Sequence, residues 1–472
     1  MTLLFLREKN KNDEFLDSSG KVTLQYLIKD KLCLDEKSNL LRTNNPLGSR
    51  GRSFLVSFIQ NHIEVNETNR KILVSSENDF NMTVTLSDSR SPNLLTTSTH
   101  RTENRTLKKI SVHYSMIPAY SLIESKAIRI TTSALTTVLI LDEGEYTSDS
   151  TIVFPIDKLS KYYIISTAPP TGEFLDSGSH FTIAATTDNT HISIVFAIDH
   201  NTSISLHDKE FGNGDTFTVI LNNFQTFQIG QHADLSGTTI NSSQPIAVFV
   251  GNRCNNIGYH GACSIQMEMI PPVDEFDDVF IVPPNINRYQ SLIRIIAPFQ
   301  TKVTYTFGGM ETTTTLLKSR YTDFTTRENE ISLIQSAKPV LVNVFAAGAT
   351  NSQVYGDPYM MTVPGINQYL NQYIVDVPEG YNFSFATFII RNESLFNLQI
   401  NNTRIDNYAT VFHSTITVGP FLFGVMTVNV PSGVIQVEST DGSLFGMLIY
   451  GQRRFDGHGY AANALLTSIC RK

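Results

Sequence analysis

The chain has 472 residues, a formal net charge of −8 and an isoelectric point near 5.8; 41% of its residues are hydrophobic and 17% are charged. This length allows several domains with large cores, and the abundance of Ser, Thr, Asn, Val, Ile, Phe and Tyr favours strands and turns over helices. The acidic balance and the lack of a basic run argue against nucleic-acid binding, which needs a concentrated cationic surface, and no 18-residue apolar stretch predicts a membrane span.

The first 50 residues differ from the remainder in charge. They hold 16 charged residues, about twice the frequency found elsewhere in the chain. The apolar run at the start, MTLLFL, is too short for the core of a signal peptide. Two interpretations stay open: residues 1–50 are a solvated, poorly ordered leader, or the gene model has lost its true start together with a signal peptide.

A short polar turn followed by a β-branched apolar run occurs four times. The spacing of the copies, roughly 95–110 residues, indicates an internal repeat, and such a repeat determines the architecture. Each copy predicts a β-strand. The copies are Thr131–Gly144, Ser242–Gly251, Ser336–Gly348 and Ser439–Gly451.

Two further phrases recur in a fixed order between these copies. In the first, a proline precedes a turn and a strand that contains aromatic residues. Proline lacks a backbone N–H and is therefore favoured before a strand rather than inside it. The copies are Ile152–Ile165, Glu268–Val282 and Met361–Val375. In the other, two strands alternate apolar and polar residues around a turn, so one face of each is buried. These hairpins are Phe181–Phe196, Ile293–Phe307 and Phe385–Ile400.

The repeats predict an all-β fold of antiparallel modules with four to five strands each. The β region is predicted to span residues 51–466, with modules at about 51–144, 150–251, 268–348 and 361–451 and a tail at 467–472. Two arrangements stay open, namely tandem β-sandwiches and a propeller-like ring. A ring would bring the first and last modules into contact.

The cysteines are too few for a disulfide scaffold and show no metal-binding C-x-x-C spacing. Cys254 and Cys263 flank a short polar loop, NNIGYHGA, so we predict a disulfide between them; the alternative is two free thiols. Closing so small a ring stabilises the fold by about 2–3 kcal/mol. A bond between Cys33 and Cys470 would join the two ends of the chain, and the state of these two cysteines stays open.

No catalytic residue, metal ligand or cofactor site is predicted. The eleven histidines are scattered without H-E-x-x-H spacing, and no G-x-S-x-G sequence is present. The acidic cluster Asp274–Asp278 lacks the glycine and the spacing of a calcium loop, which favours a solvated turn. The glycine-rich segment Gly212–Phe217 precedes a strand rather than a helix, which favours a hairpin turn over a phosphate site.

Eight sequons for N-glycosylation occur in segments that resemble loops. The 36 asparagines of this Ser/Thr-rich chain would give about six by chance, so the number alone decides little. The sequons are at Asn66, Asn81, Asn104, Asn201, Asn241, Asn382, Asn392 and Asn401.

The segment Ser242–Pro284 contains S-x-x-P before a strand, then G-N-x-C, a short loop and C-x4-E-x2-P-P. This order resembles the IgGFc-binding protein N-terminal domain family, and the resemblance extends from about Gly51 to Leu466. The family's D-N-T turn is retained at Asp188–Thr190 but not in later repeats. Ser264 stands where the family commonly has an acidic residue, whereas Glu268 is retained.

The resemblance implies a secreted, non-enzymatic module for binding or adhesion in a mucosal setting. A glycoprotein or mucin-like partner is expected, and immunoglobulin Fc follows only from weak family analogy. The matching residues form turns, strands and a disulfide, so no ligand-binding residue is transferred. The alternatives are a carbohydrate-active enzyme on a repeated β scaffold, which requires two converging carboxylates, and an intracellular structural protein with free Cys254 and Cys263.

Overall fold

The computed structural model describes residues 48–62, 70–87, 95–144, 146–171, 177–258, 262–349 and 356–466. The predicted leader and tail, Cys33, Cys470 and the sequon at Asn66 lie outside these residues. The ladders between the described strands are all antiparallel, and the short helices are 3-10 turns. These turns are η1 (Tyr114–Met116), η2 (Ile156–Lys158), η4 (Val273–Glu275), η5 (Ile366–Gln368), η6 (Asn392–Asn397) and η7 (Ile405–Asn407).

The strands form four consecutive modules with one plan. Module 1 contains β1 (Gly51–Val56), β2 (Arg70–Ser75), β3 (Phe80–Ser87), β4 (Leu95–Thr102), β5 (Lys108–Val112), β7 (Ile128–Gly144) and β8 (Thr147–Val153). Module 2 contains β9 (Ser160–Ile164), β10 (Ser179–Ala185), β11 (Thr190–Val195), β14 (Thr216–Leu221), β15 (Thr226–Gln231), β16 (Thr239–Asn255) and β17 (Ser264–Met269). A small hairpin of β12 (Ile204–Leu206) and β13 (Lys209–Phe211) is added to module 2, and β6 (Ile123–Glu124) extends its sheet through β15.

Modules 3 and 4 repeat this plan. Module 3 contains β18 (Asp277–Val282), β19 (Gln290–Ala297), β20 (Thr301–Phe307), β21 (Met310–Leu316), β22 (Arg320–Arg327), β23 (Ser332–Ala346) and β24 (Tyr359–Thr362). Module 4 contains β25 (Gln372–Val377), β26 (Phe383–Arg391), β27 (Leu398–Ile400), β28 (Thr403–Arg404), β29 (Thr410–Val418), β30 (Phe421–Asn429), β31 (Gly433–Ser439), β32 (Phe445–Arg453) and β33 (Asp456–Ala461).

In modules 1 to 3, the repeated sequence lies in one long strand whose two parts pair with different neighbouring strands. The first part of β16 pairs with β9 and β11, and its second part pairs with β10 and β17. Strands β7 and β23 divide in the same way. In module 4 the corresponding strand is interrupted between β31 and β32.

The polar turn of each phrase marks the point where the strand passes between the two sheets. In three modules a hydroxyl donates to the carbonyl two residues later: Thr132 to Ala134 at 2.9 Å, Ser242 to Gln244 at 2.7 Å and Ser336 to Lys338 at 2.7 Å. Such local bonds satisfy backbone groups that leave the ladder. The apolar run that follows each turn is buried in the second sheet.

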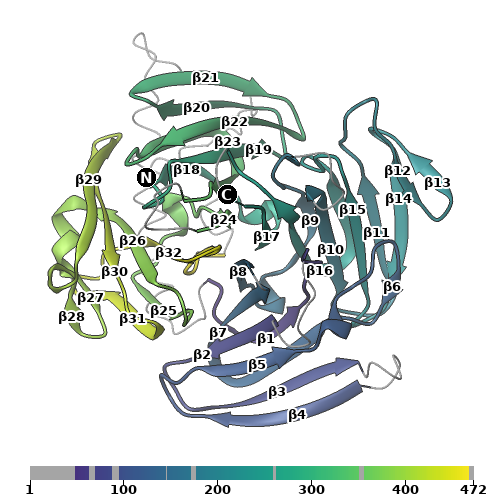
Figure 1. Ribbon diagram of the computed structural model, residues 1–472, viewed down its shortest axis with the longest axis horizontal. Helices are drawn as coiled ribbons and strands as arrows, with labels where there is room; N and C mark the ends of the chain where they lie inside the picture. Colours follow the sequence, from purple (N-terminus) through teal and green to yellow (C-terminus); the bar gives the residue numbers. More distant parts are fainter. Residues whose placement is uncertain are drawn as a thin grey trace, which may run out of the picture. The chain divides into compact units, whose positions relative to one another are not determined.

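The strand after each phrase returns to pair with it, and these four inner strands, β8, β17, β24 and β33, contact one another. Figure 1 shows the modules arranged around β8, β17 and β24. In modules 1 to 3 the predicted module end therefore comes before the returning strand, at Gly144, Gly251 and Gly348. In module 4 the predicted end, Gly451, falls within β32.

Strand β8 is fully buried although five of its seven residues, TSDSTIV, are polar. Its side chains accept hydrogen bonds from the outer edge of β17. Thr147 Oγ1 accepts from the Ile265 amide at 2.9 Å, Asp149 Oδ2 from Met267 at 2.9 Å, and Thr151 Oγ1 from Met269 at 3.0 Å. An unpaired strand edge inside a protein leaves costly backbone donors, and here these side chains replace a neighbouring strand.

Asp149 connects all four modules. Beyond Met267, it accepts hydrogen bonds from the amides of Met360 in β24 (3.0 Å), Gly459 in β33 (3.3 Å) and its neighbour Ser150 (2.8 Å). Because every donor is a backbone N–H, each carboxylate oxygen acts only as an acceptor.

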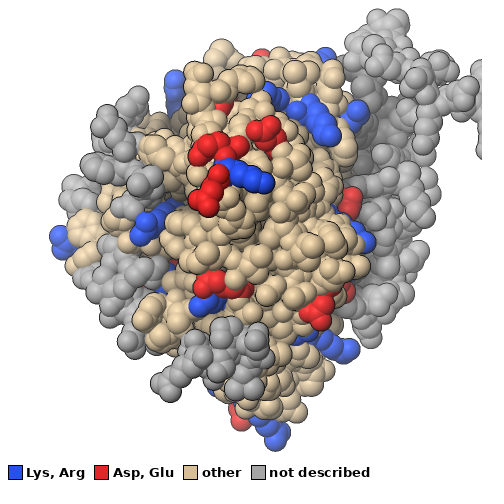
Figure 2. Space-filling model, turned by 90° about the vertical axis from the view of Figure 1, so that its right-hand side faces the viewer, with Lys and Arg blue, Asp and Glu red and all other residues tan. Residues whose placement is uncertain are grey.

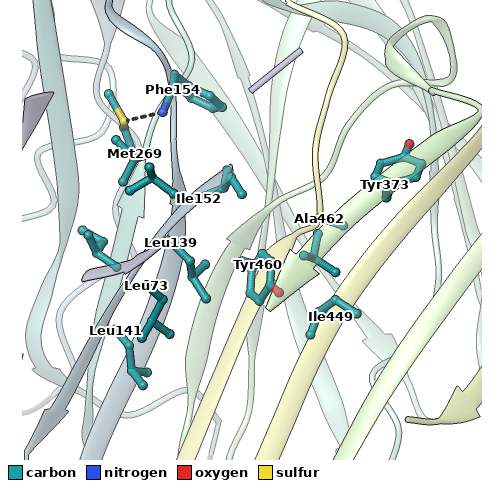
Figure 3. Close-up of a cluster of buried hydrophobic side chains, with 14 of the residues drawn as sticks. Leu73, Leu139, Leu141, Ile152, Phe154, Met269, Tyr373, Ile449, Tyr460 and Ala462 are labelled. Carbon is teal, nitrogen blue, oxygen red and sulfur yellow. Dashed lines mark hydrogen bonds between the residues drawn. The ribbon is translucent and has the colours of Figure 1, made fainter. Parts of the chain in front are cut away.

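The first and last modules are in contact. Thr137 Oγ1 of β7 donates to the Ile374 carbonyl of β25 at 2.9 Å, and Lys109 pairs with Glu379 at 2.5 Å. One hydrophobic cluster includes Leu139 and Ile152 of module 1, Met269 of module 2 and Tyr460 of module 4 (Figure 3). The Phe154 amide approaches the Met269 sulfur at 3.2 Å in this cluster.

The predicted all-β fold of repeated antiparallel modules is confirmed. Contact between the first and last modules matches one expectation of the ring alternative. However, modules 1 to 3 each contain a long strand whose two parts pair with different neighbours, and module 4 has two separate sheets. This differs from the single four-stranded sheet of a propeller blade. The propeller-like ring is therefore not established. Among the described residues, no helix is long and apolar enough to cross a membrane.

We expect Asp149→Asn to destabilise the fold although it preserves the size of the side chain. The new amide group places a donor against backbone donors, which costs about 3–5 kcal/mol of unfolding free energy. Urea unfolding followed by tyrosine fluorescence measures the change, and the exposed Asp157→Asn is the matched control. A variant within about 0.5 kcal/mol of wild type would contradict the connecting role of Asp149.

Candidate functional site

The centre of the four inner strands holds buried carboxylates whose environments differ. Burial raises the pKa of Asp149 well above its ordinary value, although its four backbone donors act in the opposite direction. Because all four donors need acceptor oxygens, the hydrogen bonds match an ionised carboxylate. Asp149 is thus a buried carboxylate whose two oxygens are satisfied by oriented N–H groups rather than by a counter-ion.

Glu268 on β17 is a second fully buried carboxyl group, and its surroundings differ from those of Asp149. Burial raises its pKa well above the ordinary value, and the nearby charge of Asp149 raises it further. Hydrogen bonds with Thr362 and Thr151 act in the opposite direction. The proximity of Asp149 therefore favours the protonated form of Glu268, because two adjacent buried carboxylates do not both ionise readily.

A pocket lies beside Glu268. It is small, with a free volume of about 30 Å³ for water-sized molecules, and its walls are mostly apolar. Asp277 also lines it, but the amide and side chain of Asn367 donate to this carboxylate at 2.9 Å each. A protonated Glu268 beside apolar walls can donate a hydrogen bond to an uncharged group. The main lining residues are Ile152, Phe154, Glu268, Phe276, Phe280, Leu341, Val363 and Leu466.

A second buried charged group, Arg288, lies beside the residues that precede β24. The fully buried Arg288 donates from Nη1 to the carbonyls of Ala347, Gly356 and Asp357, each at 2.9 Å. Burial and the charge of Asp456 raise the pKa of Asp357 to about 7. Burial also raises the pKa of Asp456 to about 6, although its ion pair with Arg453 at 2.6 Å lowers it.

Perturbed carboxylates of this kind occur both in active sites and in structural ion networks. Here Asp456 belongs to a network with Arg453, which also pairs with Glu143 of module 1 at 3.0 Å. His458, two residues further along β33, is kept neutral because burial and nearby arginines lower its pKa to about 3. Its Nδ1 lies 3.0 Å from Ser150 Oγ. These contacts join modules 1 and 4.

The predicted disulfide between Cys254 and Cys263 is present. The two Cα atoms are 4.9 Å apart, and the bond joins the end of β16 to the start of β17. It therefore closes the connection between a long strand and an inner strand of module 2. Its position is structural, since the two strands also pair directly.

Seven of the predicted sequons fall on described residues. Asn392 is partly buried at the start of η6, and the other six are exposed. The exposed asparagines are Asn81, Asn104, Asn201, Asn241, Asn382 and Asn401.

The remaining sequence features have structural roles. Asp274 accepts from Ser160 Oγ at 2.7 Å, and Asp277 is bound by Asn367, so the acidic cluster is used in contacts between segments. Among the described residues, no group of three or more His, Cys, Asp or Glu is arranged for a metal. The segment Gly212–Phe217 turns into β14, with the Gly212 amide donating to Asp215 at 2.7 Å.

Surface charge on one side is dispersed. Figure 2 shows a face that is mostly uncharged, with separate Lys and Arg groups and one small acidic cluster around a basic residue. An acidic cluster alone identifies no ligand.

Sequence reasoning missed the central residues Asp149, His458 and Arg288. The available signal for Asp149 was the polar run TSDST directly after the first repeated phrase, where the other repeats have more apolar residues. His458 and Arg288 stand in glycine-rich or loop sequences that show no periodicity.

Comparison with known proteins identifies relatives. The family model described as IgGFc binding protein matches residues 149–451. Human IgGFc-binding protein is 24% identical over 421 residues, which cover 88% of this chain but only 8% of that protein. The chain thus corresponds to a small part of this relative.

Two solved structures are similar to the chain at low identity. A Ca²⁺-stabilised, ice-binding adhesin of an Antarctic bacterium is 10% identical, with a TM-score of 0.11 and coverage of 88% of this chain and 99% of that chain. Salmonella alpha-2-macroglobulin reacted with methylamine is 9% identical, with a TM-score of 0.12 and coverage of 89% and 33%. Such scores support no inference about fold or function.

We expect Asp376→Asn to stabilise the protein at high pH. Asp376 is buried in β25, and desolvation raises its pKa from 3.8 to about 7, opposed by Lys109 and assisted by Glu379. Between these values the unfolded chain releases the proton while the folded chain keeps it, so stability falls as the pH rises. Urea unfolding should show a gain on the order of 2–3 kcal/mol at pH 8 and little change at pH 4.

The exposed Asp157→Asn serves as the control for Asp376→Asn, and its unfolding free energy should follow that of wild type at each pH. An equal gain from Asp376→Asn at pH 4 and pH 8 would show that the ionisation of Asp376 is not the cause.

Replacing Cys254 and Cys263 together by serine should lower the unfolding free energy by about 2–3 kcal/mol. Peptide-resolved alkylation of native protein should label neither cysteine until a reductant is added. Labelling of Cys254 or Cys263 before reduction would contradict the bond and favour a reducing compartment.

Proposed function

Because the chain belongs to the IgGFc-binding protein family, we propose that it is a non-enzymatic extracellular module that binds a glycoprotein. The family match over residues 149–451 is the observation that carries this proposal. The related human protein is named for binding the Fc part of immunoglobulin G, so Fc is the first ligand to test. A mucin-like glycoprotein is the second.

The scaffold supports a binding role. Four modules are joined by buried hydrogen bonds, and their connecting loops are presented on a rigid core, where recognition residues are usually found. Rigid presentation lowers the entropy that is lost on binding.

An extracellular location is supported by two features. The Cys254–Cys263 disulfide is suited to an oxidising compartment. Six sequons are exposed, so glycans at these asparagines would not disturb the core. We propose secretion and glycosylation at these sites on this basis.

The alternative, a carbohydrate-active enzyme, draws on the raised pKa values of Asp357 and Asp456. Asp456 is held in an ion pair with Arg453, and Asp357 lies beside the buried Arg288. This pattern is typical of a structural ion network, so binding without catalysis is the better supported function.

We expect the purified chain, produced through a secretory pathway with its disulfide intact, to bind immobilised Fc fragment or mucin saturably. Biolayer interferometry measures the affinity, and serum albumin is the negative control. Lack of binding to both ligands at micromolar concentration would contradict the proposed function. Hydrolysis of mucin glycans by the chain would instead favour the enzyme.

A further inference from the structure

We propose that the two adjacent hairpin tips of β7–β8 and β32–β33 form the docking surface for a protein partner. Tyr146 and Phe455 are its apolar anchors, and Arg454 pairs with an acidic group of the partner. This assignment rests on the proposed binding function and locates it on the chain.

The tips come from opposite ends of the β region and meet where modules 1 and 4 join. Tyr146 follows the first of these long strands, and Phe455 lies at the turn between β32 and β33. Their ring centroids are 5.8 Å apart at 80°, an edge-to-face arrangement. The guanidinium of Arg454 lies 4.9 Å from the centroid of Phe455. The side chain of Tyr146 is 56% exposed.

The backbone at both tips is unfavourable for aromatic residues. Tyr146 and Phe455 each have φ of 62°, in the left-handed region that glycine and asparagine adopt more easily. Turn geometry alone would therefore select glycine at both positions. Eleven other described non-glycine residues also have positive φ, among them the buried Phe224, so the backbone alone assigns no role. What distinguishes Tyr146 is that its large ring is 56% exposed at such a position.

An ion network holds the two tips together. Arg453 pairs with Glu143 beside the first tip at 3.0 Å and with Asp456 beside the second at 2.6 Å. Its guanidinium also stacks on Tyr381 at 5.1 Å from the ring centroid. Residues on tips fixed in this way lose little conformational freedom when a partner binds.

The exposed groups fit a protein surface better than a glycan. One face of Phe455 carries Arg454 and the two rings are steeply inclined, so they form no flat platform for stacking sugars. Tyrosine and arginine are enriched among the residues that dominate protein–protein affinity. Arg454 makes no ion pair with the described residues, so its charge is available to a carboxylate next to an apolar hollow of the partner.

The test uses three variants and two matched controls in the full chain. The variants are Tyr146→Gly, Phe455→Gly and Arg454→Glu. Phe299→Ala removes another exposed aromatic ring, and Arg320→Glu reverses another exposed arginine. The probes are the Fc fragment, as the protein surface, and mucin, as the glycan-bearing ligand. Affinity is measured by biolayer interferometry and stability by the urea midpoint.

We expect each of the three variants to weaken Fc binding at least tenfold and both controls to bind like wild type. The urea midpoints of Tyr146→Gly and Phe455→Gly should equal or exceed that of wild type, because glycine relieves the left-handed backbone. A clear drop in these midpoints would assign the rings to folding and overturn the proposal without any ligand.

The binding outcomes separate the two proposals. Fc binding that is unchanged in all three variants would overturn the docking surface and leave the binding function intact. Binding of mucin but not Fc, lost in the variants, would overturn the protein partner and assign the surface to a glycan. Binding of neither probe by wild type would overturn the proposed function, and the docking surface with it.

Discussion

The structure depends on satisfying the free edges of the strands that meet at its centre. Each module contributes an inner strand, and the outer edge of that strand carries backbone donors that no neighbouring strand covers. Strand β8 solves this with side chains, since Thr147, Asp149 and Thr151 accept the donors of β17. Asp149 extends the same solution to β24 and β33. A single carboxylate thereby contacts all four modules.

This arrangement determines the electrostatics of the centre. Backbone N–H groups surround the carboxylate of Asp149, and the proximity of Asp149 adds to the rise in the pKa of Glu268. Buried carboxylates with raised pKa values are therefore a consequence of how the modules are joined. Their perturbation needs no catalytic explanation, because structural networks produce the same shifts.

Much of the fold could be predicted from the sequence, because β-branched runs after polar turns predict strands and their recurrence predicts modules. The disulfide followed from the short loop between Cys254 and Cys263. The passage of each long strand between two sheets could not be predicted, since alternation identifies strands but not their partners. The polar strand β8 was missed for a related reason. Patterns of hydrophobicity locate apolar cores, whereas Asp149 is buried by hydrogen bonds to segments more than 100 residues away.

The joining of modules 1 and 4 also explains why the tips of β7–β8 and β32–β33 belong together. Ser150 and His458, in the strands behind these tips, are buried and hydrogen-bonded, which fixes both hairpins before any ligand arrives. A core secured in this way can tolerate local backbone strain at Tyr146 and Phe455, because the cost is small beside the interactions that hold the strands. The buried centre thereby allows the left-handed backbone of Tyr146 and Phe455 to persist at the ends of the two hairpins.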